Sequence, residues 1–166
     1  MIRAEHPSDR GAIFDVNARA FETDAEARLV DILRERGAVA VSLVAEVDGA
    51  VAGHILFSPV RVGDREFVAL GPMAVLPGHQ RSGIGSALVR AGIDACRARG
   101  DAAIFVLGHA EYYPRFGFVP AGPKGLHYVS TDFDPHFFVL ELREGALEGV
   151  QGFVEYHSAF DDVGQE

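Results

Sequence analysis

The amino-acid sequence predicts an α/β fold built on a central mixed sheet, and two stretches of the chain carry this prediction. Residues 41–75 contain three strand-like segments joined by tight turn signals, which is the pattern of an antiparallel β-meander. A helix-like segment at 83–99 is followed by the continuous apolar run AAIFVL at 102–107, as expected of a strand covered on both faces. Because such crossovers are right-handed, this strand should lie parallel to the last strand of the meander, with helices flanking the sheet.

One short strand and two helices are expected ahead of the meander. Ile2–Glu5 has the pattern of a strand, and an apolar stripe after Pro7 predicts a first helix. Thr23–Glu26 has the spacing of a capping box, which indicates the start of a second helix, and Gly37 ends that helix. Glu26 is therefore expected to cap the helix.

The meander is expected to consist of strands at 41–47, 50–60 and 66–75. Asp48 and Gly49 form a hairpin turn signal, and Pro59 near the end of the second strand indicates a sheet edge or a bulge. His54 lies within that second strand, where we expect a half-buried, hydrogen-bonded histidine more than a catalytic base.

The remaining chain is expected to contain one short helical turn and further strands. The turn opens at Gly108 and closes at Gly117, a strand follows at 136–142, and residues 152–157 are a candidate for a final one. We expect a single domain over residues 1–166, with a core at about residues 1–143 and a C-terminal extension at 144–166.

Charge and cysteine content restrict the function classes. The formal net charge of −9 argues against nucleic-acid binding, because phosphate contacts need a dense basic face. An acidic surface would instead favour a cationic amine as substrate. The sequence shows neither a membrane-spanning apolar run nor the apolar core of a signal peptide, so no membrane association is expected. The single cysteine, Cys96, excludes an internal disulfide and fits a cytoplasmic protein.

An anion-binding motif lies at Leu70–Leu88, where a strand end, a turn and a glycine-rich helix start follow one another. The first backbone N–H groups of a helix lack intrahelical partners, and Gly83 and Gly85 would let phosphate oxygens approach them. The segment lacks the Gly-Lys-Ser/Thr of a P-loop and the third glycine of the dinucleotide fingerprint. Four arginines on or beside the helix would add positive charge: Arg81, Arg90, Arg97 and Arg99.

Three motifs together resemble the signature of the GNAT acetyltransferase superfamily. They are MAV at 73–75, Gln-x-x-Gly-x-Gly at 80–85 and YPRFGF at 113–118. Within that superfamily, LGH at 107–109 together with the tyrosine pair is most similar to the YhbS-like branch, a group of predicted N-acetyltransferases. The resemblance covers about residues 1–143 and implies the GNAT fold.

The resemblance implies acetyl-CoA as cosubstrate, no metal, and transfer of the acetyl group to a primary amine of a small molecule or peptide by direct attack. The strands would splay apart after Val75, whose backbone would face the acetyl oxygen, while the backbone of 81–86 would hold the pyrophosphate. The implied cosubstrate-binding residues are Met73, Ala74, Val75, Arg81, Ser82, Gly83, Ile84, Gly85 and Ser86.

Tyr113 occupies the position of the family's usual tyrosine, four residues before Gly117, which implies a general acid for the leaving thiolate. A purely structural role, with the ring packed on Phe116 or Phe118, stays open. The neighbouring Tyr112 is a weaker candidate, because one residue along a helix turns the side chain by about 100°.

The base that deprotonates the amine is not identified by the sequence. Residues 69–73 lack the carboxylate that many family members carry on this strand, which leaves Glu22, His54, His109 or ordered water. The first two helices would form one wall of the acceptor site, where Asp24 and Glu26 could also meet an amine. A monomer or homodimer is expected. Two alternatives remain: a non-catalytic acyl-CoA-binding regulatory or interaction module, and a nucleotide-binding protein of a different fold.

Overall fold

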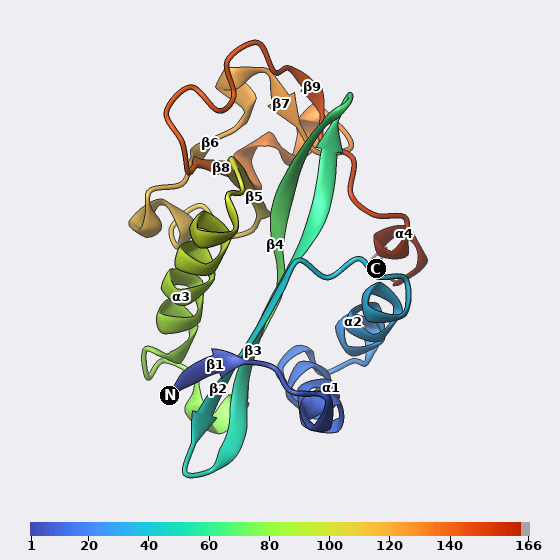
Figure 1. Ribbon diagram of the computed structural model, residues 1–166, viewed down its shortest axis with the longest axis vertical. Helices are drawn as coiled ribbons and strands as arrows, with labels where there is room; N and C mark the ends of the chain where they lie inside the picture. The colour runs from blue at the N-terminus through green and yellow to red at the C-terminus, as the bar shows by residue number, and fades with distance from the viewer. Residues whose placement is uncertain (164–166) are drawn as a thin grey trace.

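A twisted sheet with helices on both faces forms the centre of the computed structural model, which describes residues 1–163 (Figure 1). Within these residues the main sheet has seven strands in the order β1-β2-β3-β4-β5-β8-β6. The strands are β1 (Ile2–Ala4), β2 (Val41–Val47), β3 (Ala50–Val62), β4 (Arg65–Val75), β5 (Ala103–Leu107), β6 (Val119–Pro120) and β8 (Phe137–Glu141). Strands β4 and β5 are parallel, and the other neighbours are antiparallel, so the predicted mixed sheet is confirmed.

The helices cover the sheet on two sides (Figure 1). Helix α1 (Arg10–Phe21) packs on β3 and β4 and against α2 (Ala25–Glu35), while α3 (Ile84–Arg99) packs on β2, β3 and β4 from the other side. Short 3₁₀ turns connect the elements: Pro7–Asp9, Pro77–His79, Tyr113–Phe116, Gly122–Lys124 and Thr131–His136. No helix within residues 1–163 is long and apolar enough to cross a membrane.

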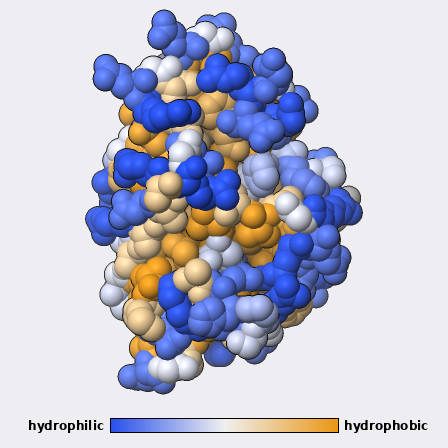
Figure 2. All heavy atoms as spheres, viewed as in Figure 1, coloured by the Kyte–Doolittle hydropathy of each residue, from blue (hydrophilic) through white to orange (hydrophobic). Residues whose placement is uncertain are grey.

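Side chains of β4 alternate between two separate parts of the core. Val68 and Leu70 pack with Leu88 and Val89 of α3, whereas Phe67 and Ala69 belong to a cluster on the opposite face. Successive residues of a strand point to opposite faces, which explains this division. A third cluster joins α1 and α2 to β2 and β3. Apolar side chains also reach the surface over the strands between α3 and the α1–α2 pair (Figure 2).

The predicted capping box at Thr23–Glu26 is wrong. Helix α2 begins one residue later than the box requires, with Asp24 as its N-cap, so Glu26 occupies the second helical position. A side chain at that position cannot reach back to the N-cap as a third-position glutamate does. Instead, Glu26 Oε1 is buried and has no hydrogen-bond partner among the described residues.

The chain after β8 builds a small second sheet and covers the end of β3. Strand β7 (Leu126–His127) pairs in parallel with β9 (Gly152–Phe153), and Glu155 exchanges two backbone hydrogen bonds with Arg61 of β3, at 3.0 and 2.7 Å. Helix α4 (Ala159–Val163) packs against α2. The predicted strand at 152–157 is therefore reduced to β9 and one bridge. Strands β6 and β7 were not predicted, since two residues are too few for a periodic pattern.

The second meander strand continues to Val62, beyond the predicted end at residue 60. Its pairing with β2 ends at Phe57, so Pro59 lies where β3 pairs with β4 alone. Proline has no N–H to donate, and this position tolerates that loss. The edge predicted from Pro59 is confirmed.

Candidate active site

A gap opens in the main sheet where β4 and β5 separate. Their parallel pairing joins Val68 to Ile104 and ends with Leu70 and Val106. Immediately afterwards, Gly71 and Pro72 form a bulge, because Leu70 and Met73 pair with residues 57 and 55 of β3. Gly71 adopts a φ of 146°, a conformation that favours glycine. The strands therefore separate after Leu70, five residues before the predicted point, because the bulge turns β4 away from β5.

The end of β4 presents backbone groups to this gap. Leu76 donates its N–H to Ala52 O of β3, at 2.8 Å. Backbone groups of successive strand residues point to alternating sides, so Val75 and Met73 direct theirs away from β3. The side chain of Gln80 is consistent with this direction, because its Nε2 donates to Val75 O at 3.0 Å. The N–H groups of Met73 and Val75 thus point to the side of β4 where pairing with β5 has already ended.

The glycine-rich loop forms a second set of free backbone donors. Arg81 and Gly83 have φ values of 63° and 89°, and alternation of this kind turns successive N–H groups into one concavity that suits anions. A Cβ placed at Gly83 would meet nothing within 4 Å. The N–H of Ala87 bonds to Gly83 O at 3.0 Å, which leaves the N–H groups of the preceding helical residues without intrahelical partners.

The other predicted loop residues have different surroundings. Ser82 Oγ donates to His79 O and so holds the loop, and Ile84, the first residue of α3, packs against the core. A Cβ at Gly85 would lie 3.3 Å from Tyr112 Oη and 3.6 Å from Met73 Cε. Gly85 therefore also allows close packing of these two side chains, and its role in phosphate approach stays a prediction.

The structure brings Tyr113 to the end of β5. Its side chain is only 8% exposed and lies so close to Gly108, directly after β5, that a Cβ there would collide with the ring. The ring packs edge-on against Phe118, at a centroid distance of 5.7 Å. Burial, with a smaller effect of Tyr112, raises the pKa of the phenol to about 12. The hydroxyl thus stays protonated at neutral pH.

Tyr112 points to the start of α3. Its Oη lies 3.4 Å from Ser86 Oγ, and its ring meets that of Tyr113 edge-on at 5.1 Å. The two tyrosines therefore occupy different places: Tyr113 packs beside the end of β5, and Tyr112 borders the glycine-rich loop.

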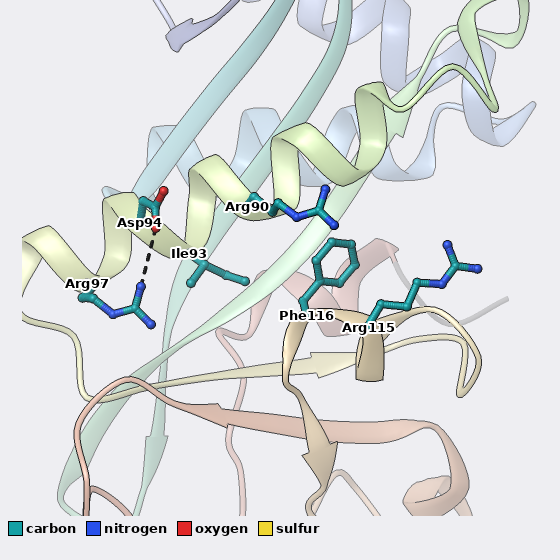
Figure 3. Close-up of a pocket in the computed structure, with 6 residues that line it drawn as sticks. All are labelled: Arg90, Ile93, Asp94, Arg97, Arg115 and Phe116. Carbon is teal, nitrogen blue, oxygen red and sulfur yellow. Dashed lines mark ion pairs between the residues drawn. The ribbon is translucent and has the colours of Figure 1, made fainter.

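A cavity of about 360 Å³ lies between α3 and the 3₁₀ turn Tyr113–Phe116 (Figure 3). Its lining residues are Arg90, Ile93, Asp94, Arg97, Arg115 and Phe116. The Arg90 guanidinium lies over the Phe116 ring at 5.2 Å, and Arg97 pairs with Asp94 at 3.5 Å. We call this the arginine cavity.

Only part of the predicted positive charge lies near the loop. Arg81 belongs to the loop itself, and Arg90 is in the second turn of α3. Arg99 ends the same helix, roughly 22 Å farther along its axis than the first residue. There it bonds to Asp101 at 2.9 Å and to Ala40 O. Arg99 therefore stabilises the far end of α3 and does not serve the loop.

His54 is unsuited to act as the base. It is fully buried, with an exposed fraction of 0%, instead of half-buried as predicted. Its Nδ1 lies 3.1 Å from Asn17 Nδ2, which can only donate, and its Nε2 lies 2.9 Å from Ser42 Oγ, which in turn donates to Glu5. Burial lowers the His54 pKa to about 4, so the ring is neutral.

The other base candidates lie at the surface. Glu22 follows α1 with a φ of 60°, and His109 is exposed beside the tyrosine pair. Within residues 1–163, no group of three or more His, Cys, Asp or Glu side chains could hold a metal ion.

Sequence reasoning missed Tyr156. Its hydroxyl is buried and has no hydrogen-bond partner among residues 1–163. Burial is the main reason why the pKa of this hydroxyl is raised, and Tyr128 and then Tyr113 raise it further. No local pattern around residue 156 could have indicated this burial, because it comes from tertiary packing against Tyr128 and other rings.

Comparison with known proteins identifies relatives over nearly the whole chain. The model of the acetyltransferase (GNAT) family matches residues 10–118. YhbS of Escherichia coli, described as an uncharacterized N-acetyltransferase, is 40% identical over 164 residues, which cover 97% of this chain and 98% of YhbS. YjhQ of Escherichia coli, described in the same words, is 44% identical over 125 residues, which cover 71% of this chain and 69% of YjhQ.

Solved structures agree with this result. The crystal structure of Escherichia coli YhbS in complex with CoA superposes with a TM-score of 0.93 at 40% identity, covering 97% of this chain and 91% of the other. A GNAT family acetyltransferase from Brucella melitensis in complex with acetyl-CoA gives a TM-score of 0.83 at 39% identity, with 97% of both chains covered. This chain therefore belongs to the GNAT acetyltransferase family, in a branch that it shares with YhbS.

Proposed function

We propose that this protein is an acetyl-CoA-dependent N-acetyltransferase that acetylates a primary amine of a small molecule or peptide by direct attack. One observation carries the proposal: the free backbone donors at the end of β4 lie directly before the free donors of the glycine-rich loop. The relatives support it, since YhbS was crystallised with CoA and the Brucella protein with acetyl-CoA.

We expect acetyl-CoA to bind with its pyrophosphate at the glycine-rich loop and its thioester arm along the end of β4. Acetyl-CoA supplies an activated acetyl thioester and an anionic nucleotide. The concavity at residues 81–86 would hold the pyrophosphate, since Gly83 leaves open space beside the free N–H groups. Met73, Ala74 and Val75 would line the thioester arm, because β4 pairs there with β3 alone.

The arginine cavity suits the nucleotide end of the cosubstrate. Arg90 lies beside the aromatic ring of Phe116 (Figure 3), and Arg115 extends from the neighbouring position of the same 3₁₀ turn over the Tyr112 ring. Arg90 is seven residues nearer the loop along α3 than Arg97. Guanidinium groups bind phosphate with charge-assisted hydrogen bonds, and the ring offers a stacking surface for a base. We assign this cavity to the 3′-phosphate and adenine.

Chain residues supply two of the chemical requirements. The Val75 N–H donates to the acetyl oxygen as negative charge develops on it, which lowers the barrier when the C–N bond forms. Tyr113, protonated at neutral pH, donates its proton to sulfur as the C–S bond breaks. Removal of the amine proton is left to Glu22, His109 or water, because both His54 nitrogens are occupied.

Acetyl transfer to amines tests the proposal directly. Purified protein is given acetyl-CoA and a panel of amines, polyamines, amino acids and peptides, and release of free thiol is measured. Amine-dependent release supports an enzyme, whereas CoA binding without turnover of any amine favours a non-catalytic acyl-CoA-binding module. A competition experiment between CoA and adenine nucleotides tests the remaining alternative. If adenine nucleotides fail to displace CoA, the protein is not a general nucleotide-binding protein.

The proposal extends to the cellular setting. The net charge of −9 disfavours nucleic acid as a partner. We place the protein in the cytoplasm, away from membranes, as a monomer or homodimer. Salt-sensitive binding to DNA or RNA near physiological ionic strength would contradict this part of the proposal.

A further inference from the structure

A second cavity, of about 300 Å³, lies among β9, α4 and the chain that follows β7. Its lining residues are Tyr128, Val129, Phe153, Val154, Glu155, Tyr156, Phe160 and Asp161. We call it the acidic cavity. Tyr128 packs against Phe137 of β8 at 5.8 Å, whereas Phe116 of the arginine cavity packs with the cluster that contains Phe138. Successive strand residues point to opposite faces, so the two cavities lie on opposite sides of the sheet.

Aromatic rings form the walls of the acidic cavity. Tyr156 meets Tyr128 edge-on at 4.9 Å and Phe160 edge-on at 5.1 Å. At the surface, Phe153 is 52% exposed and Val129 is 66% exposed. Val129 also has a φ of 59°, a conformation that is costly for a β-branched residue. Exposed apolar side chains and strained backbone of this kind concentrate at ligand sites.

The charges of the acidic cavity are negative. Glu155 and Asp161 line it, and its lining residues, all within 1–163, include no Lys or Arg. Asp161 lies close enough to Tyr128 to raise the pKa of that phenol, together with burial. Glu155 is held in place by its two backbone hydrogen bonds to Arg61. Carboxylates beside aromatic faces attract a cation through both Coulombic and cation–π contacts.

Tyr156 connects this cavity to the gap between β4 and β5. Its ring lines the cavity and meets Tyr128 at 4.9 Å, Tyr128 packs against Phe137 at 5.8 Å, and Phe137 pairs with Leu107, the last residue of β5. The Tyr156 hydroxyl is buried and has no partner within residues 1–163. A ligand bound against the outer part of the ring therefore lies near the proposed reaction centre but not in it.

We propose that the acidic cavity binds the acceptor through a second cationic group, so that the substrate is a di- or polyamine. One ammonium group sits among the rings between Glu155 and Asp161, and the other amine reaches the gap past Tyr156. This inference rests on the proposed acetyl transfer, and it assigns the acceptor to the face opposite the arginine cavity. Each added charge-assisted contact favours a diamine over a monoamine of equal length.

The test measures binding separately from turnover. Calorimetry of the protein–CoA complex with putrescine, a diamine, and with butylamine, its monoamine counterpart, should give saturable binding of putrescine that is at least about tenfold tighter. The double variant Glu155→Gln/Asp161→Asn should lose at least about tenfold in putrescine affinity and keep its CoA affinity. Glu148→Gln, an exposed change in the same C-terminal segment, is the matched control and should leave both affinities unchanged.

Equal affinities for putrescine and butylamine, or an unchanged affinity in the double variant, would overturn the assignment. Because binding is read without turnover, this failure is distinct from failure of the acetyl transfer, which appears as absent thiol release with every amine. If putrescine binds as expected, its KM in the thiol assay should rise in the double variant and stay at the wild-type value in Glu148→Gln.

Discussion

The two cavities lie on opposite faces of the sheet. Each is lined by aromatic residues, but the charged side chains around them are mainly positive in one and negative in the other. Three arginines and one aspartate line the arginine cavity with Phe116, whereas Glu155 and Asp161 line the acidic one with Tyr156. The net charge of −9 is therefore an average over two unlike surfaces. This difference suggests how the protein keeps its substrates apart: the anionic one approaches along α3, the cationic one from the other side, and both meet where β4 and β5 separate.

The largest effect is expected at the meeting point, from Tyr113→Phe. The variant keeps the ring that packs on Phe118 but removes the proton donor, so kcat should fall by about 10²–10⁴. The affinity for CoA should stay near wild type, because in the proposed mechanism the hydroxyl acts only on the leaving sulfur. Pre-steady-state turnover and calorimetry measure the two quantities.

Tyr112→Phe is the control for this experiment. Its hydroxyl faces Ser86 at the start of α3, so a small change in CoA affinity and little change in kcat are expected. If Tyr113→Phe turns over at the wild-type rate under conditions where chemistry limits the rate, Tyr113 is not the general acid. Solvent water would then be the proton donor, and the role of Tyr113 would be structural.

The next largest effect concerns stability on the face covered by α1, where His54 is buried. Its pKa is about 4 in the folded protein and 6.5 in the unfolded chain, so the unfolded state binds more protons between these values. The free energy of unfolding should be unaffected by this group above pH 6.5 and should fall by about 3 kcal/mol as the pH drops to 4.

Urea unfolding at several pH values measures this slope, and His54→Gln should remove it. His136→Gln, which changes an exposed histidine, is the control and should retain it. A slope that survives in His54→Gln would assign the acid sensitivity to other groups, such as Asp9, whose pKa is lowered to about 2 by Arg3 and the His6 N–H.

A substitution in the glycine-rich loop tests the anionic side. Gly83 has a φ of 89°, which Asn and Asp tolerate better than other residues, so Gly83→Asn and Gly83→Asp carry equal backbone strain. The aspartate adds a negative charge beside the proposed pyrophosphate, and CoA should bind at least about tenfold more weakly to it than to the asparagine variant. Equal CoA affinities of the two folded variants would contradict the assignment of this loop to the pyrophosphate.

The smallest effect is expected in the arginine cavity. The double variant Arg90→Gln/Arg115→Gln should weaken acetyl-CoA binding by about tenfold, because two charge-assisted contacts to the 3′-phosphate are removed. Binding of dephospho-acetyl-CoA, which lacks that phosphate, should change little. A similar loss for both ligands would place the 3′-phosphate outside this cavity.

Features with local patterns were predicted from the sequence, and features made by tertiary packing were not. The meander, the crossover strand and the helix that starts after Gly83 follow from turn residues and apolar periodicity, and all are present. The early separation at Leu70 was missed because the bulge depends on how β4 pairs with β3. The acidic cavity was missed because it joins residues near 128 to residues near 156. The division into core and extension at residue 143 stays a prediction.

The bulge at Gly71 and Pro72 also affects how this part of the protein can change over generations. Beyond it the N–H groups of Met73 and Val75 have no strand partner in β5, and a main-chain N–H is the same whatever side chain it carries. Residues at the reaction centre can therefore drift in identity without losing the donor, provided that the kink in β4 persists. Substitution of the Val75 side chain therefore does not test the proposed N–H donor. Replacing the Val75 amide by an ester removes that N–H and tests it directly.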